Sequence, residues 1–320
     1  MNRHLIKPKR LSAGSVVGLV APASNVEEND RIYYATEILQ SIGFRVKLGG
    51  HIYKRNGYCA GSSAERAEDI NKMFADKEVE GIFALRGGFG SIHVAPLLDY
   101  KLIQANPKVL IGYSDITILL NAIHVKTGLV TFHGPTATSP FSDYTLAELR
   151  KVLCEAHTAI PLAAPPKNEL KPGVVERRNR IKKISEGRAR GRLVGGNLYC
   201  LLRMLGTPYA PDFNSSILFL EECGEKPYKI DGMLTQLRLA GVLQCVAAVV
   251  LGKFLAKPML PDSELALEQL FADTFGDLQI PVIRGLMIGH ISDQATIPIG
   301  VEASIDSDAS QLILHENAVT

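Results

Sequence analysis

The 320-residue sequence has no apolar run near the ~18–20 residues that a membrane-spanning helix needs, so we do not expect an integral membrane protein. Its first residues, Met1 to Arg10, are not followed by the apolar stretch and small-residue cleavage site of a signal peptide, which argues against secretion. Lys and Arg total 35 against 33 Asp and Glu. This balance does not suggest a protein that binds nucleic acid or a membrane surface.

Cysteine is also scarce, because the five residues are scattered and form no C-x-x-C pair. Neither a structural zinc site nor a disulfide framework is therefore expected. Unpaired thiols fit the reducing cytoplasm, which is the compartment we expect. The sequence does contain 46% hydrophobic and 21% charged residues, the balance of a folded globular protein with room for two domains.

The first half alternates between apolar runs and helical patterns. Strands are expected at Val16–Ala21, Phe44–Leu48, Gly81–Leu85 and Val109–Gly112, and helices at Arg31–Ser41 and from Ser63 to about Ala75. Capping-box spacings occur at Ser24–Glu27 and Ser62–Glu65. This alternation predicts an α/β fold with a parallel sheet covered by helices, whose reactive residues gather at the carboxyl ends of the strands.

A proline-rich stretch from His157 to Pro172 separates the two halves of the chain. We expect an N-terminal domain over residues 1–156, a linker over 157–175 and a second α/β domain over 176–320, more strand-rich at its end. Its elements are expected at Ile217–Leu220, Tyr228–Leu239, Val246–Leu251, Ser263–Phe275, Val301–Ile305 and Gln311–Leu314.

A basic stretch opens the second half: residues 177–192 hold eight Lys or Arg and one acid, Glu186. A nucleic-acid interface is one interpretation, but no aromatic residue is interleaved for base stacking. A solvated β-ribbon, or a patch that faces an acidic substrate, fits the composition better.

The segment Leu110–Thr117 gives the sharpest local signal for chemistry. An apolar strand runs into a turn at Gly112–Ser114, and a helical pattern follows. A serine on such a turn presents its hydroxyl beside the positive end of a helix, with backbone N–H groups for an oxyanion. The hydrolase pattern G-x-S-x-G is incomplete because Ile116 takes the fifth position, and Ser114 also fits a helix N-cap.

Paired glycines form a second candidate site in Arg86–Ser91, at the end of an expected strand. Gly87 or Gly88 could donate to an oxyanion, and Arg86 could bind a substrate carboxylate. The alternative is a tight turn with a solvated arginine. The dinucleotide pattern G-x-G-x-x-G and the P-loop are both absent.

A nucleophilic serine needs a base and a carboxylate that orients it. His133 closes an expected strand, and His290 follows a glycine in a turn between apolar segments. Glu221 and Glu222 end an apolar strand, where a carboxylate needs a partner. Composition and spacing do not choose between the two histidines or between the two acids.

Seven blocks, in this order, resemble the LD-carboxypeptidase family of serine peptidases: Arg86–Gly90, Gly112–Asp115, Phe132–Pro135, Gly195–Leu198, Gly206–Pro208, Leu220–Glu221 and Gly289–His290. The similarity extends over nearly the whole chain. It implies a flavodoxin-like N-terminal domain, a swivelling β/α C-terminal domain and an active site between them.

Carried over by position, the resemblance assigns the nucleophile to Ser114, the base to His290 and the orienting carboxylate to Glu221. The mechanism that it implies is acyl transfer, with the N–H groups of Asp115 and of the Gly87–Gly88 turn stabilising the oxyanion. Arg86 is our hypothesis for the group that pairs with the terminal carboxylate of the substrate. Neither a metal nor an organic cofactor is required.

The family implies removal of the terminal D-residue, typically D-alanine after meso-diaminopimelate, from cytoplasmic muropeptides in peptidoglycan recycling, by a homodimer. One alternative is the microcin-immunity branch, which cleaves acyl-sulfamoyl or aminoacyl adenylates and often stacks a tryptophan on the base. This chain has no tryptophan, although tyrosine or phenylalanine can also stack. The other alternative is a non-catalytic muropeptide binder, which would have no need of the Ser-Glu-His set.

Overall fold

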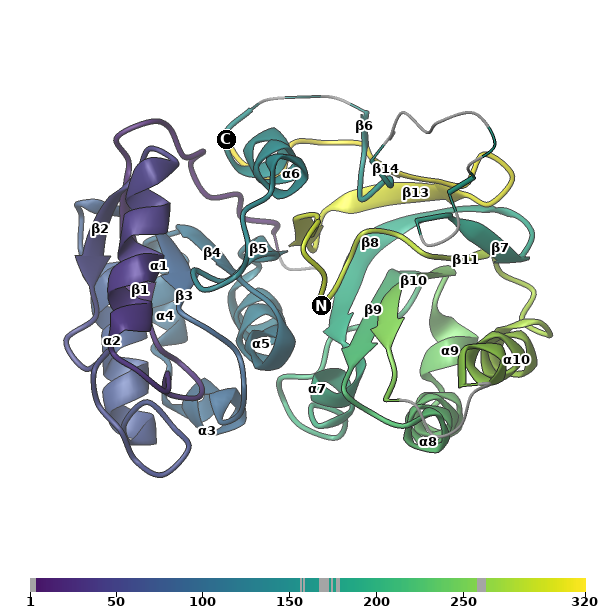
Figure 1. The fold of residues 1–320 in the computed structure, drawn as a ribbon, viewed down its shortest axis with the longest axis horizontal. Coiled ribbons are helices and arrows are strands. Elements are labelled where there is room, and N and C mark those ends of the chain that lie inside the picture. Colours follow the sequence, from purple (N-terminus) through teal and green to yellow (C-terminus); the bar gives the residue numbers. More distant parts are fainter. Residues whose placement is uncertain are drawn as a thin grey trace.

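The computed structural model describes residues 4–155, 157, 159–166, 173, 175–176, 179–257 and 263–320, and describes only the backbone of 263–266. Residues 158, 167–172 and 174 of the expected linker and two arginines of the basic stretch, Arg177 and Arg178, lie outside these residues. Two sheets lie side by side, each with its own set of helices (Figure 1). None of the described helices is both long and apolar enough to cross a membrane.

The first sheet has, in the described part of the chain, the strand order β12-β5-β4-β3-β1-β2. Its strands are β1 (Val16–Val20), β2 (Arg45–Leu48), β3 (Val79–Ala84), β4 (Val109–Gly112), β5 (Thr131–His133) and β12 (Ile297–Ile299). Strands β1 to β5 pair in parallel, while β12 pairs antiparallel with β5. The order 2-1-3-4-5 is that of flavodoxin-like folds, so the expected N-terminal architecture is confirmed.

The helices of this half are α1 (Asp30–Ser41), α2 (Ser63–Ala75), α3 (Ser91–Val94), η1 (Ala95–Leu97), α4 (Tyr100–Ala105), η2 (Ser114–Ile116), α5 (Thr117–Thr127) and α6 (Asp143–Leu153). The capping box at Ser62 and Glu65 is confirmed. The one expected at Ser24 is wrong, because α1 starts later, with Asn29 at its N-cap. The Ser24 hydroxyl accepts a hydrogen bond from Phe89 N (3.0 Å) instead.

The second sheet has the order β6-β14-β13-β8-β9-β10-β11-β7 among the described residues. Its strands are β6 (Ile160–Pro161), β7 (Lys182–Ser185), β8 (Arg188–Asn197), β9 (Ile217–Cys223), β10 (Ala248–Leu255), β11 (Val282–Arg284), β13 (Glu302–Asp306) and β14 (Gln311–Leu314). The central strands β8 to β11 are parallel, and the outer ones are antiparallel. Its helices are α7 (Leu198–Leu202), α8 (Pro227–Leu239), α9 (Val242–Cys245) and α10 (Ser263–Phe275), which confirms a second β/α domain.

The basic stretch does not form the expected β-ribbon. Its strands β7 and β8 do not pair with each other, because β7 pairs with β11 and β8 lies between β13 and β9. Several of its cations instead form ion pairs with acids of the same chain, among them Lys182 with Glu268, Lys183 with Asp308 and Arg188 with Asp306.

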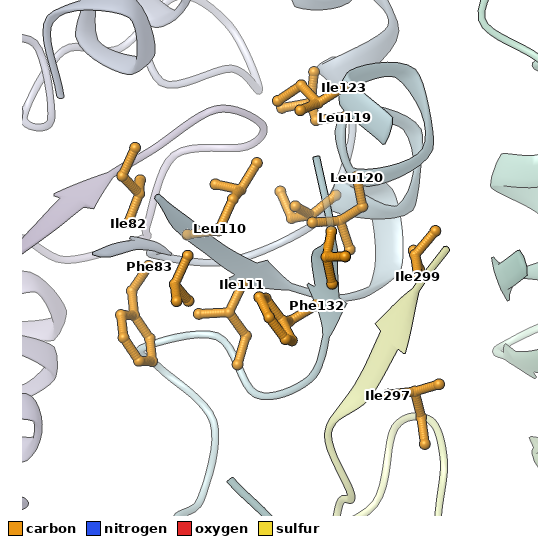
Figure 2. Close-up of a cluster of buried hydrophobic side chains, with 14 of the residues drawn as sticks. Ile82, Phe83, Leu110, Ile111, Leu119, Leu120, Ile123, Phe132, Ile297 and Ile299 are labelled. Carbon is orange, nitrogen blue, oxygen red and sulfur yellow. The ribbon is translucent and has the colours of Figure 1, made fainter. Parts of the chain in front are cut away.

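Strand β12 is the element that joins the C-terminal segment to the first sheet. Figure 2 shows Ile297 and Ile299 of this strand near Phe132 of β5, next to Ile111 of β4. All four side chains are fully buried. Burying a large apolar side chain stabilises the fold by about 1.5–3 kcal/mol. The loop of residues 285–296 therefore starts at β11 in the second sheet and ends at β12 in the first. It carries His290 along the boundary between the two sheets.

Candidate functional site

Ser114 lies on the tight turn between β4 and η2. Its backbone φ of +63° is in the left-handed region, which costs a non-glycine residue about 1–3 kcal/mol and persists only where the surrounding structure holds it. The N-caps of η2 and α5 are Tyr113 and Ile116, so the interpretation of Ser114 as a helix cap is wrong. The turn instead holds a half-buried hydroxyl at the carboxyl end of a central strand.

The glycine loop, residues Arg86–Ser91, packs directly against this turn. A Cβ added to Gly87 would lie 2.7 Å from Ser114 Cβ and 3.3 Å from Asp115 N, so only glycine allows the approach. Ser24 holds the loop from the other side: Phe89 N donates to Ser24 Oγ (3.0 Å), and Ser24 N donates to Gly87 O (3.4 Å). Gly88 has a φ of +114°, a conformation that favours glycine. The structure thus brings Gly87, Ser114 and the Asp115 amide together.

The Asp115 side chain anchors the turn to the start of α3. Its carboxylate is buried, and Oδ2 accepts a hydrogen bond from Ser91 N (2.8 Å) at the start of α3. Burial raises the pKa of Asp115, and the hydrogen bonds from Ser91 oppose that shift. A carboxylate fixed in this way leaves only the backbone N–H of Asp115 for the oxyanion role.

Glu221 and His290 form the second half of the site. His290 Nδ1 donates to Glu221 Oε2 at 2.8 Å, with the carboxylate fully buried and the imidazole 20% exposed. Gly289 permits this contact, because an added Cβ would lie 2.8 Å from the same oxygen. Burial lowers the pKa of His290, but contacts with Cys223 and Glu221 and the charge of Glu221 outweigh it and raise the pKa to about 11.

Glu222, the second acid, faces the other side of β9 and does not contact the histidine. Its carboxylate accepts from Tyr199 N (2.9 Å) and Cys223 N (2.9 Å) and from Asn197 Nδ2 (3.3 Å). Burial raises its pKa to about 7 despite these hydrogen bonds. The alternation of side chains along a strand therefore settles which acid faces His290.

His133, the other candidate base, ends β5 beneath this pair. Its ring is fully buried between Phe219 (centroids 5.4 Å apart) and Tyr113 (6.2 Å). Neither ring nitrogen has a hydrogen-bond partner among the described residues. Burial lowers the pKa of His133 to about 4, so the ring is neutral at pH 7. His133 is thus removed from solvent, whereas His290 reaches it.

The two halves meet through contacts between the sheets. Tyr113, the residue before Ser114, packs edge-on against His290 with ring centroids 4.7 Å apart. Asn197 N donates to Thr117 Oγ1 (3.1 Å), and Asn121 Nδ2 donates to Gly195 O (2.9 Å), so the end of β8 docks on the first turn of α5. The Gly195–Leu198 block, which carried no role in the sequence, supplies this junction.

Two arginines flank the glycine loop, and one of them was not anticipated. Arg86 Nη1 donates to Asn25 O (3.0 Å) at the start of the loop. Arg203, just after α7, lies with Cζ 4.4 Å from the Phe89 ring centroid, and no sequence motif marked it. The described residues contain no group of three or more His, Cys, Asp or Glu placed to hold a metal ion.

Comparison with known proteins gives a consistent family. The model of the LD-carboxypeptidase N-terminal domain matches residues 17–134, and that of the LD-carboxypeptidase C-terminal domain matches residues 190–305. A probable murein peptide carboxypeptidase of Bacillus subtilis is 37% identical over 315 residues, covering 97% of this chain and 94% of its own length.

Solved structures agree over nearly the full length. A muramoyltetrapeptide carboxypeptidase from Oxalobacter formigenes superposes with a TM-score of 0.79 at 29% identity, covering 94% of this chain and 98% of that one. The microcin C7 self-immunity protein MccF, in complex with glutamyl sulfamoyl guanosine, gives a TM-score of 0.86 at 28% identity, covering 98% and 99%.

Proposed function

This chain belongs to the LD-carboxypeptidase family, and from that premise we propose that it is a serine carboxypeptidase that removes the terminal D-residue from murein tetrapeptides. One observation carries the proposal. His290, paired through Nδ1 with the buried carboxylate of Glu221 (2.8 Å), packs against Tyr113, whose neighbour Ser114 is presented on a strained turn. A nucleophile, a base and an orienting group are the set that acyl transfer requires.

In the proposed mechanism, His290 takes the proton of Ser114 as the hydroxyl attacks the scissile carbonyl. Glu221 accepts the Nδ1 hydrogen, which leaves Nε2 as the basic nitrogen. The backbone N–H groups of Asp115 and of the Gly87–Gly88 turn stabilise the oxyanion, at about 3 kcal/mol for each donor. His290 returns the proton to the leaving amine, and water then hydrolyses the acyl-enzyme.

The proposed substrate ends in an L-centre joined to a D-residue, such as meso-diaminopimelate followed by D-alanine in a muropeptide. A carboxypeptidase must recognise the free terminal carboxylate, and we assign Arg86 to this contact. Its Nη1 bond to Asn25 O fixes the side chain at the start of the glycine loop, with its other donors left for a ligand.

A second candidate function is hydrolysis of acyl-sulfamoyl or aminoacyl adenylates. The similarity to MccF bound to glutamyl sulfamoyl guanosine favours it. So does the exposed Tyr58, whose ring packs edge-on against Phe89 of the glycine loop (5.4 Å) and could stack on a base.

The deciding experiment incubates the purified protein with a muramoyl tetrapeptide ending in D-alanine and measures released D-alanine by mass spectrometry. We expect release by the wild type and none by Ser114→Ala. Release that persists in the variant would remove Ser114 as the nucleophile. Cleavage of an aminoacyl-sulfamoyl adenylate without release of D-alanine would support the immunity-type function instead.

The setting we propose is the cytoplasm, in peptidoglycan recycling, with the protein as a homodimer that needs no cofactor. Light scattering on the purified protein tests the dimer, and a monomeric mass would exclude it. Dialysis against a chelator should leave the release of D-alanine unchanged.

A further inference from the structure

Arg203 joins the two halves of the molecule at the edge of the serine site. It follows α7 in the C-terminal half, where its Cζ lies 5.4 Å from the ring centroid of Tyr199. The same Cζ lies 4.4 Å from the ring centroid of Phe89, in the glycine loop of the N-terminal half. The guanidinium thus has aromatic contacts on two sides, a setting that fixes its plane without using its N–H donors.

The donors of Arg203 are free in the described part of the structure. Its contact with a carboxylate, from Nη1 to Asp115 Oδ1, measures 3.8 Å, which is too long for a hydrogen bond. That oxygen is buried and has no hydrogen-bond partner of its own among the described residues. The Arg203 side chain is 20% exposed, so a ligand can reach it.

The other arginines beside the glycine loop are more fully used. Arg66 is buried and donates to Pro22 O (2.7 Å) and Gly90 O (3.0 Å), so it serves the fold. Arg86 gives one donor to Asn25 O. Of the three, Arg203 therefore has the most side-chain N–H donors without a hydrogen bond among the described residues.

The position of Arg203 relates it to the reacting bond. It contacts the side chain of Asp115, the residue after Ser114, and the ring of Phe89, two residues after Gly87. Arg86 precedes the two glycines and Arg203 lies over the residue that follows them. Arg86 thus begins the loop that packs against Ser114, and Arg203 contacts the same loop at Phe89.

We propose that Arg203 is a substrate-binding residue that pairs with the terminal carboxylate of the peptide, together with Arg86 at the start of the glycine loop. This inference rests on the proposed carboxypeptidase function and deepens it. A planar guanidinium held between two rings can meet a carboxylate with two parallel N–H donors. The substrate is thereby selected for a free terminus beside the scissile bond.

The test measures binding separately from catalysis, in the Ser114→Ala background. Calorimetry compares a muramoyl tetrapeptide ending in D-alanine with the same peptide whose terminal carboxylate is converted to an amide. We expect the acid to bind about tenfold or more tightly than the amide. Adding Arg203→Met should abolish most of that difference by weakening the acid alone, and Arg203→Lys should restore part of it.

Arg284→Met is the matched control, because Arg284 also lies over an aromatic ring, Phe271 (5.9 Å), but pairs with Glu268 away from the serine. It removes the same charge and should leave the discrimination intact. A purely structural Arg203 would weaken acid and amide equally, and that result would overturn the proposal. If Arg203→Met does not fold, as judged by its thermal unfolding, the Arg203→Lys comparison decides in its place.

The remaining outcomes separate this inference from the proposed function. Discrimination that depends on Arg203, with no D-alanine released by the wild type, would support the carboxylate site and reject the hydrolysis. Release of D-alanine by the wild type, with a preference for the acid over the amide that does not change in Arg203→Met, would support the hydrolysis and reject the carboxylate site. Failure of Ser114→Ala to bind either peptide, with no D-alanine released by the wild type, would overturn both.

Discussion

The serine and the histidine are positioned by different physical means. Ser114 is held by backbone geometry: a positive φ and a glycine, Gly87, packed against its Cβ. His290 is held by charge, through a hydrogen bond to the buried carboxylate of Glu221. The first arrangement tolerates no added atom but does not depend on pH. The second depends on the protonation of His290 and Glu221, so the two halves should fail in distinguishable ways.

The largest expected effect comes from Glu221→Gln. In the proposed mechanism, loss of the carboxylate removes the group that fixes the tautomer of His290, and such a loss costs about 10³–10⁴ in kcat in Ser-His-Asp triads. The base must be neutral, and Glu221 raises the pKa of His290, so wild-type kcat/KM should rise with pH well above 6.5. In Glu221→Gln this rise in kcat/KM, the rising limb of the pH–rate profile, should move to lower pH. A pH–rate profile of D-alanine release measures its position.

Glu222→Gln is the control for that profile, because Glu222 neighbours Glu221 but faces away from His290. In Glu222→Gln the rising limb of the pH–rate profile should stay at the wild-type pH. An unmoved limb in Glu221→Gln would show that the charge of Glu221 does not set the protonation of the base.

Gly87→Ala tests the other half of the comparison. The new methyl would lie 2.7 Å from Ser114 Cβ, so the turn or the loop must shift. The backbone N–H is retained, and displacement alone should lower kcat about 100-fold. The pH of the limb should stay that of the wild type, because Glu221 and His290 are untouched.

The control for added volume is Gly232→Ala, since Gly232 lies in α8 and, apart from its chain neighbours and the backbone of its own helix, no described atom lies within 4 Å of the new methyl. Alanine favours a helix over glycine, so this variant should be fully active. A Gly87→Ala enzyme with wild-type kcat would mean that the strained turn is not what positions Ser114.

The same contrast explains what the sequence could predict. Apolar runs and caps are local signals, so strands β1 to β4 and helix α2 were confirmed at nearly their expected bounds. Strand β12 has three residues, one of them Pro298, and pairs at a sheet edge with a strand far away in sequence, so no local pattern marks it. The partners of the basic strands are equally remote.

The choice of base shows the same limit at the site itself. His133 and His290 both follow apolar segments, and their difference lies in burial: the ring of His133 is enclosed by Phe219 and Tyr113, from β9 and the turn after β4. Burial of that kind depends on tertiary packing. Only the family resemblance, which compares whole patterns, favoured His290 from sequence.

A smaller effect is expected on stability, from His133. Its folded-state pKa, about 4, lies below the usual 6.5, so the unfolded chain binds more protons between these values and wild-type stability falls as pH drops from 6.5 to 4. At about 1.4 kcal/mol per pH unit this amounts to about 3 kcal/mol. The destabilisation caused by His133→Gln should therefore shrink by that amount between pH 7.5 and 4, as measured by denaturant unfolding.

A His133→Gln curve that stays parallel to the wild type across that range would mean that His133 has the same pKa in the folded and the unfolded protein. In His133→Gln the rise of kcat/KM with pH should stay at the wild-type pH, since His290 retains its hydrogen bond to Glu221.

Glu222 should produce the smallest effect, with the opposite sign. Its folded-state pKa, about 7, lies above the usual 4.5, so the folded protein binds more protons and wild-type stability falls as pH rises from 4.5 to 7. Glu222→Gln removes that loss, worth about 1–3 kcal/mol, and should gain stability relative to the wild type as pH rises. Between pH 4.5 and 6.5 the contributions of His133 and Glu222 to the slope of stability with pH have opposite signs, so removing either one should change the wild-type slope in the opposite direction from removing the other. Parallel profiles for Glu222→Gln and the wild type would show that the hydrogen bonds from Tyr199 and Cys223 offset the burial of this carboxylate.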